Sequence, residues 1–133
     1  MILADTSIWI DYFNGMDSQE TDLLDSALND GTIAMGDLIF LEILQGFRDD
    51  KEFNRAKRTL ATLDQYELYG NHMVDKCAYN YRFLRKKGIT IRKTIDLIIA
   101  TFCLENKIQL LFSDKDYVPF VDFLNLKRYR SNT

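Results

Sequence analysis

Histidine is almost missing from this chain of 133 residues, because His72 is the only one. Catalytic triads and the usual zinc sites depend on histidine, so both are excluded, together with histidine-based acid–base chemistry. The chain also has only one proline and six glycines, without a repeat or a low-complexity tract, which leaves no segment suited to a linker. We therefore expect a single domain over residues 1–133.

Long hydrophobic runs are also missing. Only four residues precede Asp5, too few for a secretory signal, and no apolar run approaches the roughly 20 residues that span a bilayer. Cys77 and Cys103 both lie among apolar residues, as buried thiols do in a reducing compartment. These features predict a cytoplasmic protein without membrane association.

Charge is distributed unevenly along the chain. Residues 1–50 contain eleven acidic residues and one base, whereas residues 51–133 contain sixteen bases and nine acids. An acidic focus beside a basic strip suits a site that holds cations and receives a polyanion such as RNA, although a solvated helix face explains the basic strip equally well. The strip has six members: Arg82, Arg85, Lys86, Lys87, Arg92 and Lys93.

Strand-like and helix-like segments alternate along the sequence. Short apolar runs predict strands over residues 2–5, 32–35, 66–69 and 108–112, with an edge strand over 124–130. Helical spacing predicts helices after residue 5 and over residues 17–29, 37–47, 49–63, 72–87, 94–106 and 119–123, with caps at Asp17, Asp37, Asn71 and Thr94. This alternation is typical of an α/β fold with a mostly parallel sheet.

Two acidic residues of the N-terminal part have competing explanations. Asp5 follows the first apolar strand and is well placed to cap the next helix, or to enter a site at the carboxyl end of that strand. Glu42 interrupts the apolar segment LIFLEIL, where a carboxylate is costly unless it is paired or binds a metal. An ion pair with Arg48 is the simple alternative for Glu42.

Three further acids lie in the segment TIDLIIATFCLENKIQLLFSDKDY, residues 94–117. Asp96 follows Thr94 near the start of a helix, where the N-terminal dipole favours negative charge. Asp114 and Asp116 follow the last apolar strand, where aspartate commonly shapes a turn. Helix and turn preferences therefore account for each residue taken singly.

Taken together, the acids are expected to meet at one edge of the sheet. Carboxylates a few Å apart repel one another, and a divalent cation removes this conflict. Oxygen ligands without histidine or cysteine favour Mg²⁺ or Mn²⁺ over zinc. Such a site predicts metal-assisted phosphodiester hydrolysis with an activated water as the nucleophile.

The segments MILADTSIWIDYF, LEILQGF and TIDLIIATFCLENKIQLLFSDKDY resemble, in order, the motifs of the PIN domain, in particular those of VapC-type ribonuclease toxins. The resemblance implies a three-layer α/β/α sandwich with a mostly parallel central sheet. It assigns the acidic quartet to Asp5, Glu42, Asp96 and Asp114, which would act as catalytic and metal-binding residues. Asp116 matches an additional acid of less constant role, and the supporting hydroxyls would be those of Thr6, Ser7 and Thr94.

The same resemblance implies a function and partners. The chain would be a magnesium- or manganese-dependent endoribonuclease that cleaves structured RNA at tRNA or rRNA loops. It would act as the toxin of a toxin–antitoxin pair, form a homodimer and bind a small VapB-like antitoxin. The alternative is a catalytically silent PIN-like module that only binds RNA or metal.

Aromatic side chains in the early helices are candidates for an interface with the antitoxin or a second subunit, because aromatic anchors dominate interfaces. Aromatics at helical spacing are more often part of the core, so both interpretations stay open. The candidates are Trp9, Tyr12, Phe13, Phe40 and Phe47.

Overall fold

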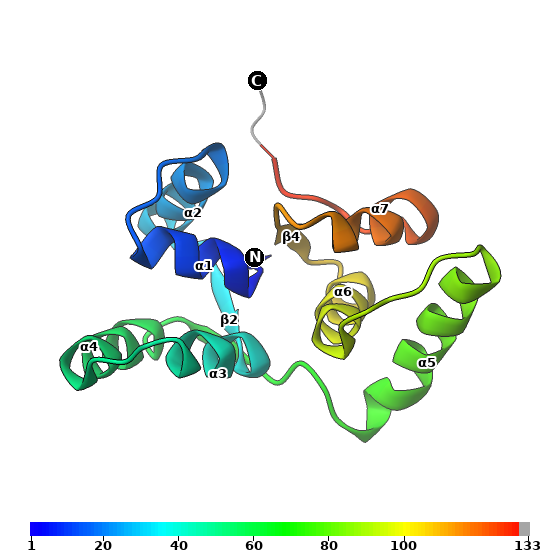
Figure 1. The fold of residues 1–133 in the computed structure, drawn as a ribbon, viewed down its shortest axis with the longest axis horizontal. Coiled ribbons are helices and arrows are strands. Elements are labelled where there is room, and N and C mark those ends of the chain that lie inside the picture. Colours follow the sequence, from blue (N-terminus) through cyan, green and yellow to red (C-terminus); the bar gives the residue numbers. More distant parts are fainter. Residues whose placement is uncertain (131–133) are drawn as a thin grey trace.

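The computed structural model describes residues 1–130, in which strands and helices alternate (Figure 1). The alternation that the sequence predicts is present, with shifts at individual ends. The elements are β1 (Ile2–Ala4), α1 (Thr6–Phe13), α2 (Gln19–Asp30), β2 (Ala34–Gly36), α3 (Asp37–Gln45), α4 (Asp50–Leu60), β3 (Asp64–Tyr66), α5 (Asn71–Lys86), α6 (Thr94–Asn106), β4 (Gln109–Leu111), the 3₁₀ helix η1 (Lys115–Tyr117) and α7 (Val118–Leu124).

The strands form two parallel pairs, β1 with β4 and β2 with β3. A parallel bridge between Ile2 and Ile33 joins the pairs, and a second bridge between Leu110 and Arg128 extends the β4 edge. The order across the sheet is therefore Arg128, β4, β1, β2, β3, which confirms the predicted mostly parallel arrangement. The predicted edge strand over 124–130 reaches the sheet at its expected place, but only through the bridge at Arg128.

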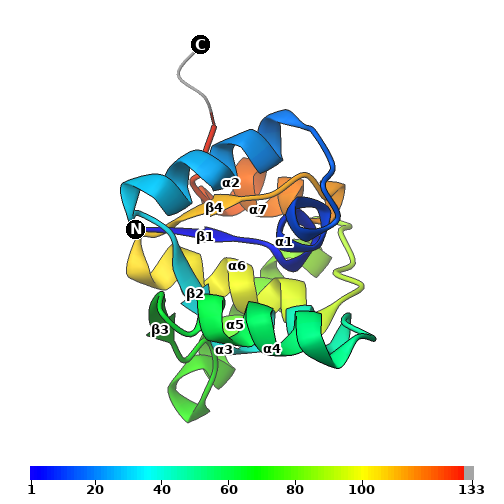
Figure 2. The same cartoon turned by 90° about the vertical axis from the view of Figure 1, so that its left-hand side faces the viewer.

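Helices cover both faces of the strands, as a three-layer α/β/α sandwich requires (Figure 2). Figure 2 shows β1 and β4 side by side near the centre, and Figure 1 shows α1 to α4 on one side of the strands and α5, α6 and α7 on the other. Every residue of β1 is buried, because a parallel strand between two helical layers has no face toward solvent. Among the described residues 1–130, no helix is both long and apolar enough to cross a membrane.

Helix starts differ from the predictions at several caps. Ser18, not Asp17, caps α2, and its hydroxyl forms a reciprocal capping box with Thr21. Asp37, Asn71 and Thr94 each occupy the first position of their helix, and none of them is the cap. In each case the residue before them adopts the non-helical conformation of the cap. α2 ends at its C-cap, Gly31, which adopts the left-handed conformation that favours glycine (φ 71°).

The strand predicted over 66–69 lies instead at Asp64–Tyr66. Leu68 is not part of the strand, because its backbone N–H donates to the Asp37 carboxylate (3.0 Å). Its side chain is fully buried. A Cβ atom on Gly36 would lie 2.5 Å from Leu68 Cδ1, so glycine is needed where these two segments cross. This contact fixes the start of α3, the helix that carries Glu42.

α6 is the central helix of the fold. Its residues from Asp96 to Cys103 are all buried, so the helix has no solvent-facing stripe over two turns. Such a helix is held by contacts on every side, chiefly with α5, β4 and η1. Asp96 in its first turn is therefore a carboxylate with a closely defined position.

Candidate active site

Two adjacent parallel strands bring their carboxyl ends to one edge of the sheet. Asp5 directly follows β1, and Asp114 lies in the turn after β4. The backbone N–H of Asp5 donates to the carbonyl of Leu111 (2.9 Å), which ties the two strand ends together. α6 and α3 add Asp96 and Glu42 at the same edge, the usual position of ligand sites in parallel sheets.

These residues line a cleft of about 420 Å³. The cleft contains the four acids of the predicted quartet and all three hydroxyl residues that the sequence singles out, together with a lysine and two isoleucines. Its lining residues are Asp5, Thr6, Ser7, Ile10, Glu42, Lys93, Thr94, Ile95, Asp96 and Asp114.

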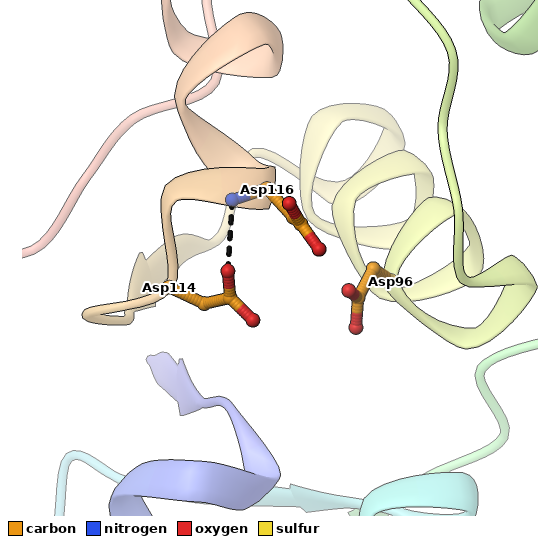
Figure 3. Close-up of side chains that lie close together, drawn as sticks. All are labelled: Asp96, Asp114 and Asp116. Atoms are coloured by element: carbon orange, nitrogen blue, oxygen red, sulfur yellow. Dashed lines mark hydrogen bonds between the residues drawn. The ribbon is translucent and has the colours of Figure 1, made fainter.

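Three carboxylates form the tightest cluster of the site (Figure 3). One oxygen each from Asp96, Asp114 and Asp116 lies within 4.8 Å of the other two. Asp116 is therefore one of the three members of the cluster, although its place in a turn alone did not indicate this. Asp5 and Glu42 line the same cleft without belonging to this tightest group.

Asp5 combines the two roles that the sequence leaves open. It caps α1, and its Oδ2 accepts from the Ser7 hydroxyl (2.8 Å) and from the Ser7 N–H (3.4 Å). Its side chain also lines the cleft, and its other oxygen, Oδ1, accepts from the Tyr117 hydroxyl (2.7 Å). Capping therefore holds Asp5 in the site and does not withdraw it from the site.

Glu42 is held by a hydroxyl and not by a base. Its Oε1 accepts from the Thr6 hydroxyl at 2.6 Å, a contact between α3 and the first residue of α1. Within residues 1–130, Glu42 forms no ion pair with Arg48. The arginine alternative for Glu42 is therefore wrong.

Two bases of the strip pair with the acids of the SDKDY turn. Arg92 contacts Asp116 Oδ1 (3.1 Å), and Lys93 Nζ lies 3.8 Å from Asp114 Oδ2. Both basic side chains are largely exposed, so each pair contributes at most about 1 kcal/mol. Asp114 Oδ1 also accepts from the Asp116 N–H (2.9 Å), so the turn-making role predicted for Asp114 is present as well.

The family model of the PIN domain matches residues 2–121 of this sequence. The chain belongs to the PIN domain family. The match spans every residue of the acidic cleft.

Relatives and solved structures agree with this assignment. A VapC ribonuclease of Mycobacterium bovis and Ribonuclease VapC11 of Mycobacterium tuberculosis are each 29% identical over 129 residues, covering 96% of both chains. The fold is similar to that of VapBC2 from Rickettsia felis, solved bound to a promoter DNA fragment (TM-score 0.69, 20% identity, 99% of this chain and 100% of that one). It is also similar to a toxin–antitoxin complex from Klebsiella pneumoniae (TM-score 0.65, 19% identity, 98% and 100%).

Asp96 is the most perturbed acid of this PIN domain. Burial, followed by the nearby charge of Asp5, raises the pKa of Asp96 to about 6, while Tyr117 and Lys93 oppose the shift. Its Oδ2 is one of two buried side-chain polar atoms without a hydrogen-bond partner in residues 1–130. Unpaired buried carboxylate oxygens are costly and mark functional sites.

The donor set fits a hard divalent cation. Two unit charges about 5 Å apart near a protein surface repel by about 3 kcal/mol, and the cluster brings three acids within that range. All available ligands are oxygens, which Mg²⁺ and Mn²⁺ prefer. The partnerless Asp96 Oδ2 supplies a vacant lone pair, so Asp96, Asp114 and Asp116 are residues that could hold such an ion.

Tyr117 is a site residue that sequence reasoning missed. Its side chain is fully buried, and its hydroxyl lies 2.7 Å from Asp5 Oδ1 and 3.1 Å from Asp96 Oδ1. A buried tyrosine hydroxyl normally requires a partner, so a tyrosine between an acidic turn and an apolar helix was the available signal. The position of Tyr117 in the sequence does not, however, predict which carboxylates its hydroxyl contacts.

The basic strip lies at the end of α5 and in the segment that leads into α6. All six of its side chains are exposed. Arg85 lies over the Tyr81 ring (5.6 Å to the centroid) and Lys87 over the Phe83 ring (5.5 Å). The strip therefore extends from the cleft, at Lys93, onto the aromatic surface of α5, and its role in RNA binding stays a prediction.

The aromatic candidates for an interface differ in their exposure. Trp9 is only 1% exposed, so it belongs to the core and cannot anchor a partner at the surface. Phe13 is 38% exposed and packs against Phe47 (centroids 5.7 Å apart, 70° between planes). Tyr12 and Phe40 are partly buried against the core.

Proposed function

We propose that this PIN domain is a metal-dependent endoribonuclease that hydrolyses phosphodiester bonds in structured RNA, at loops of tRNA or rRNA. The observation that carries the proposal is the cluster of three carboxylate oxygens within 4.8 Å, one of them from buried Asp96. The mycobacterial relatives, which are named as ribonucleases, support the reaction class.

The side chains of the cleft would divide the work. Asp96, Asp114 and Asp116 would hold Mg²⁺ or Mn²⁺, with Asp5 and Glu42 facing the same space. When bound there, such an ion would supply positive charge for activating a water nucleophile and for stabilising the leaving oxygen. Lys93, at the rim, would attract the phosphate of the bound RNA, and its present ion pair at 3.8 Å is loose enough to be exchanged.

An RNA-cleavage assay in Mg²⁺, with and without EDTA, tests this function. We expect cleavage by the wild-type chain to stop in EDTA, and Asp96→Asn to reduce it by at least 100-fold. Asp122→Asn, which neutralises an exposed acid on α7, is the matched control and should cleave as the wild type does. Cleavage that survives both EDTA and Asp96→Asn would exclude a metal nuclease.

The second candidate is a PIN-like module that binds RNA or metal without turnover. Its specific support is that Lys93 and Arg92 pair with Asp114 and Asp116. If these ion pairs persisted when RNA is bound, the two acids would not be available to a catalytic metal. The same assay distinguishes the candidates, because a silent module binds Mn²⁺ and RNA but leaves the RNA intact over hours at high protein concentration.

We further propose that the chain is the toxin of a toxin–antitoxin pair and that a VapB-like antitoxin peptide binds between α1, α3 and α4. A cavity of about 280 Å³ lies there, with Phe13, Ile43 and Phe47 on its walls and Arg48 and Glu52 on its rim. Ile10 lines both this cavity and the acidic cleft. A peptide in the cavity would therefore reach the carboxylates, where an arginine could pair with them.

Co-purification with the product of a small neighbouring gene tests the antitoxin. We expect a stable complex that suppresses RNA cleavage. Phe13→Ala should weaken the complex by at least 10-fold, whereas Phe123→Ala, which truncates an even more exposed phenylalanine on α7, should leave it intact. Equal weakening by both variants would place the peptide elsewhere.

The remaining expectations concern assembly and location. We propose a homodimer that acts in the cytoplasm, and exposed Tyr79 (64%), which stacks on Phe83 one turn later, gives α5 an aromatic surface suited to a subunit interface. Light scattering after size-exclusion chromatography measures the mass in solution. A monomer at micromolar concentration would exclude the homodimer.

A further inference from the structure

The Tyr117 hydroxyl joins two acids that are far apart in the sequence. It donates to Asp5 Oδ1 at 2.7 Å across 112 positions, and it contacts Asp96 Oδ1 at 3.1 Å across 21 positions. Asp5 follows β1 and Asp96 begins α6, so one hydroxyl spans the gap between a strand end and a helix start.

The remaining oxygens of the two acids show what this contact achieves. Asp5 Oδ2 is held by Ser7, so with Tyr117 on Oδ1 both oxygens of Asp5 are fixed. Asp96 has only Oδ1 held, and its Oδ2 is buried without a partner. Holding one oxygen of Asp96 therefore fixes the direction of the other, which is the oxygen available to a cation.

Tyr117 is fixed to the turn that carries Asp114 and Asp116. Its N–H donates to the carbonyl of Asp114 (3.3 Å), and Asp114 caps the same 3₁₀ turn through the N–H of Asp116. The ring packs against Phe112 with centroids 5.1 Å apart. The turn that supplies Asp114 and Asp116 thus also supplies the hydroxyl that contacts Asp5 and Asp96.

The position of the Tyr117 hydroxyl, between the two carboxylates, also matters. Packing alone does not require this group, because a phenylalanine ring fills the same space against Phe112. The hydroxyl acts on the carboxylates and not on the core.

We propose that Tyr117 is a positioning residue that fixes the spacing and rotamers of Asp5 and Asp96 and thereby sets the affinity of the acidic cluster for a divalent cation. The inference rests on the proposed metal-dependent function, which it deepens. Without the hydroxyl, Asp96 is free to turn, and binding of the cation must then also order its side chain. Groups that hydrogen-bond to metal ligands, without contacting the metal themselves, typically contribute about 10–100-fold to metal affinity.

Metal titration of Tyr117→Phe tests the proposal. Isothermal titration with Mn²⁺ should show a Kd at least about 10-fold weaker than that of the wild type, with the far-ultraviolet circular dichroism spectrum unchanged. RNA cleavage at low Mn²⁺ should fall, and saturating Mn²⁺ should restore it, while the KM for RNA stays the same. A merely structural hydroxyl would not produce rescue by metal.

Tyr12→Phe is the matched control. The Tyr12 hydroxyl donates to Asp25 Oδ1 at 2.7 Å, the same kind and length of bond as that of Tyr117, but outside the cleft. This variant should bind Mn²⁺ as tightly as the wild type. If Tyr117→Phe also binds within twofold of the wild type, the positioning role is wrong although metal-dependent cleavage stands. If the wild type binds no Mn²⁺ and cleaves equally well in EDTA, the proposed function fails and the inference fails with it.

Discussion

Thr6 and Glu42 are joined by a hydrogen bond of 2.6 Å between the Thr6 hydroxyl and Glu42 Oε1. Thr6 is the first residue of α1, and Glu42 lies in the middle of α3, so the bond connects two walls of the acidic cleft. Neither residue belongs to the three-carboxylate cluster. Glu42 is therefore an acid of the cleft that lies outside the cluster and is held by a hydroxyl.

Thr6→Val tests the value of this bond. Valine keeps the shape of threonine and removes the donor, so Glu42 loses its orientation while the start of α1 stays packed. We expect RNA cleavage to fall about 10-fold, and the free energy of unfolding to fall by about 1 kcal/mol because the bond is missing. Cleavage rates and urea unfolding measure the two effects. Thr59→Val, which removes an exposed hydroxyl on α4, is the control, and equal losses in both variants would contradict a role for Thr6 in the site.

Asp96→Asn should stabilise the metal-free protein at high pH. The pKa of Asp96 rises from 3.8 to about 6 on folding, so the folded state binds its proton more tightly than the unfolded state does. This favourable contribution is fully present below about pH 3.8 and is lost as the pH rises through 6. At pH 8 in EDTA we expect the variant to be about 1 to 3 kcal/mol more stable than the wild type.

Urea unfolding at pH 5 and pH 8 measures this difference. The advantage of Asp96→Asn should shrink at pH 5, where the wild-type carboxyl is mostly protonated. Asp122→Asn should show no such change between the two pH values, because Asp122 is exposed. A loss of stability in Asp96→Asn at pH 8 would mean that the ionised carboxylate contributes to folding, contrary to its burial.

Addition of Mn²⁺ should stabilise the wild-type protein, and the effect should grow with pH. A ligand at about 100 times its Kd stabilises the folded state by about 2.7 kcal/mol. Protons compete with the ion for Asp96, so the shift in Tm should be larger at pH 8 than at pH 5. Differential scanning calorimetry with and without Mn²⁺ gives the shift. An equal shift in Asp96→Asn would show that the ion binds outside the cluster.

Neutralising Arg85, Lys86 and Lys87 together should weaken RNA binding. For single-stranded RNA, the slope of log Kd against log salt falls by about 0.7 for each phosphate that a base no longer neutralises, so the salt dependence should also flatten. Fluorescence anisotropy with a labelled RNA at several salt concentrations measures both quantities. The matched control neutralises three exposed bases of α4: Lys51, Lys57 and Arg58. Equal effects of the two triple variants would mean that net charge, and not the basic strip, governs binding.

Periodicity and element ends were sufficient to predict the architecture and the meeting of the acids. Asp5 and Asp114 were placed correctly because each follows an apolar run, and the carboxyl ends of adjacent parallel strands share one edge. Glu42 was recognised because a carboxylate inside an apolar helix needs a partner. Its partner could not be predicted, since Thr6 is 36 positions away.

Local competition explains the errors. Ser18 and Asp17 are both good caps, and only the Thr21 hydroxyl, which completes the capping box, decides between them. The shift of β3 depends on Leu68 crossing over Gly36, a tertiary contact with no counterpart in local propensity. Tyr117 was missed for the same reason, because its partners are defined by packing and not by spacing.

The bond between Tyr117 and Asp5 also has a consequence for the synthesis of the chain. Its two ends are 112 positions apart, and β1 has no β4 to pair with until Leu111 has been added. A nascent chain on the ribosome therefore contains Asp5 and Glu42 long before the carboxylates of the SDKDY turn exist. An enzyme that cleaves RNA would, by this topology, remain inert beside the translation machinery until the SDKDY turn had been made and β4 had paired with β1.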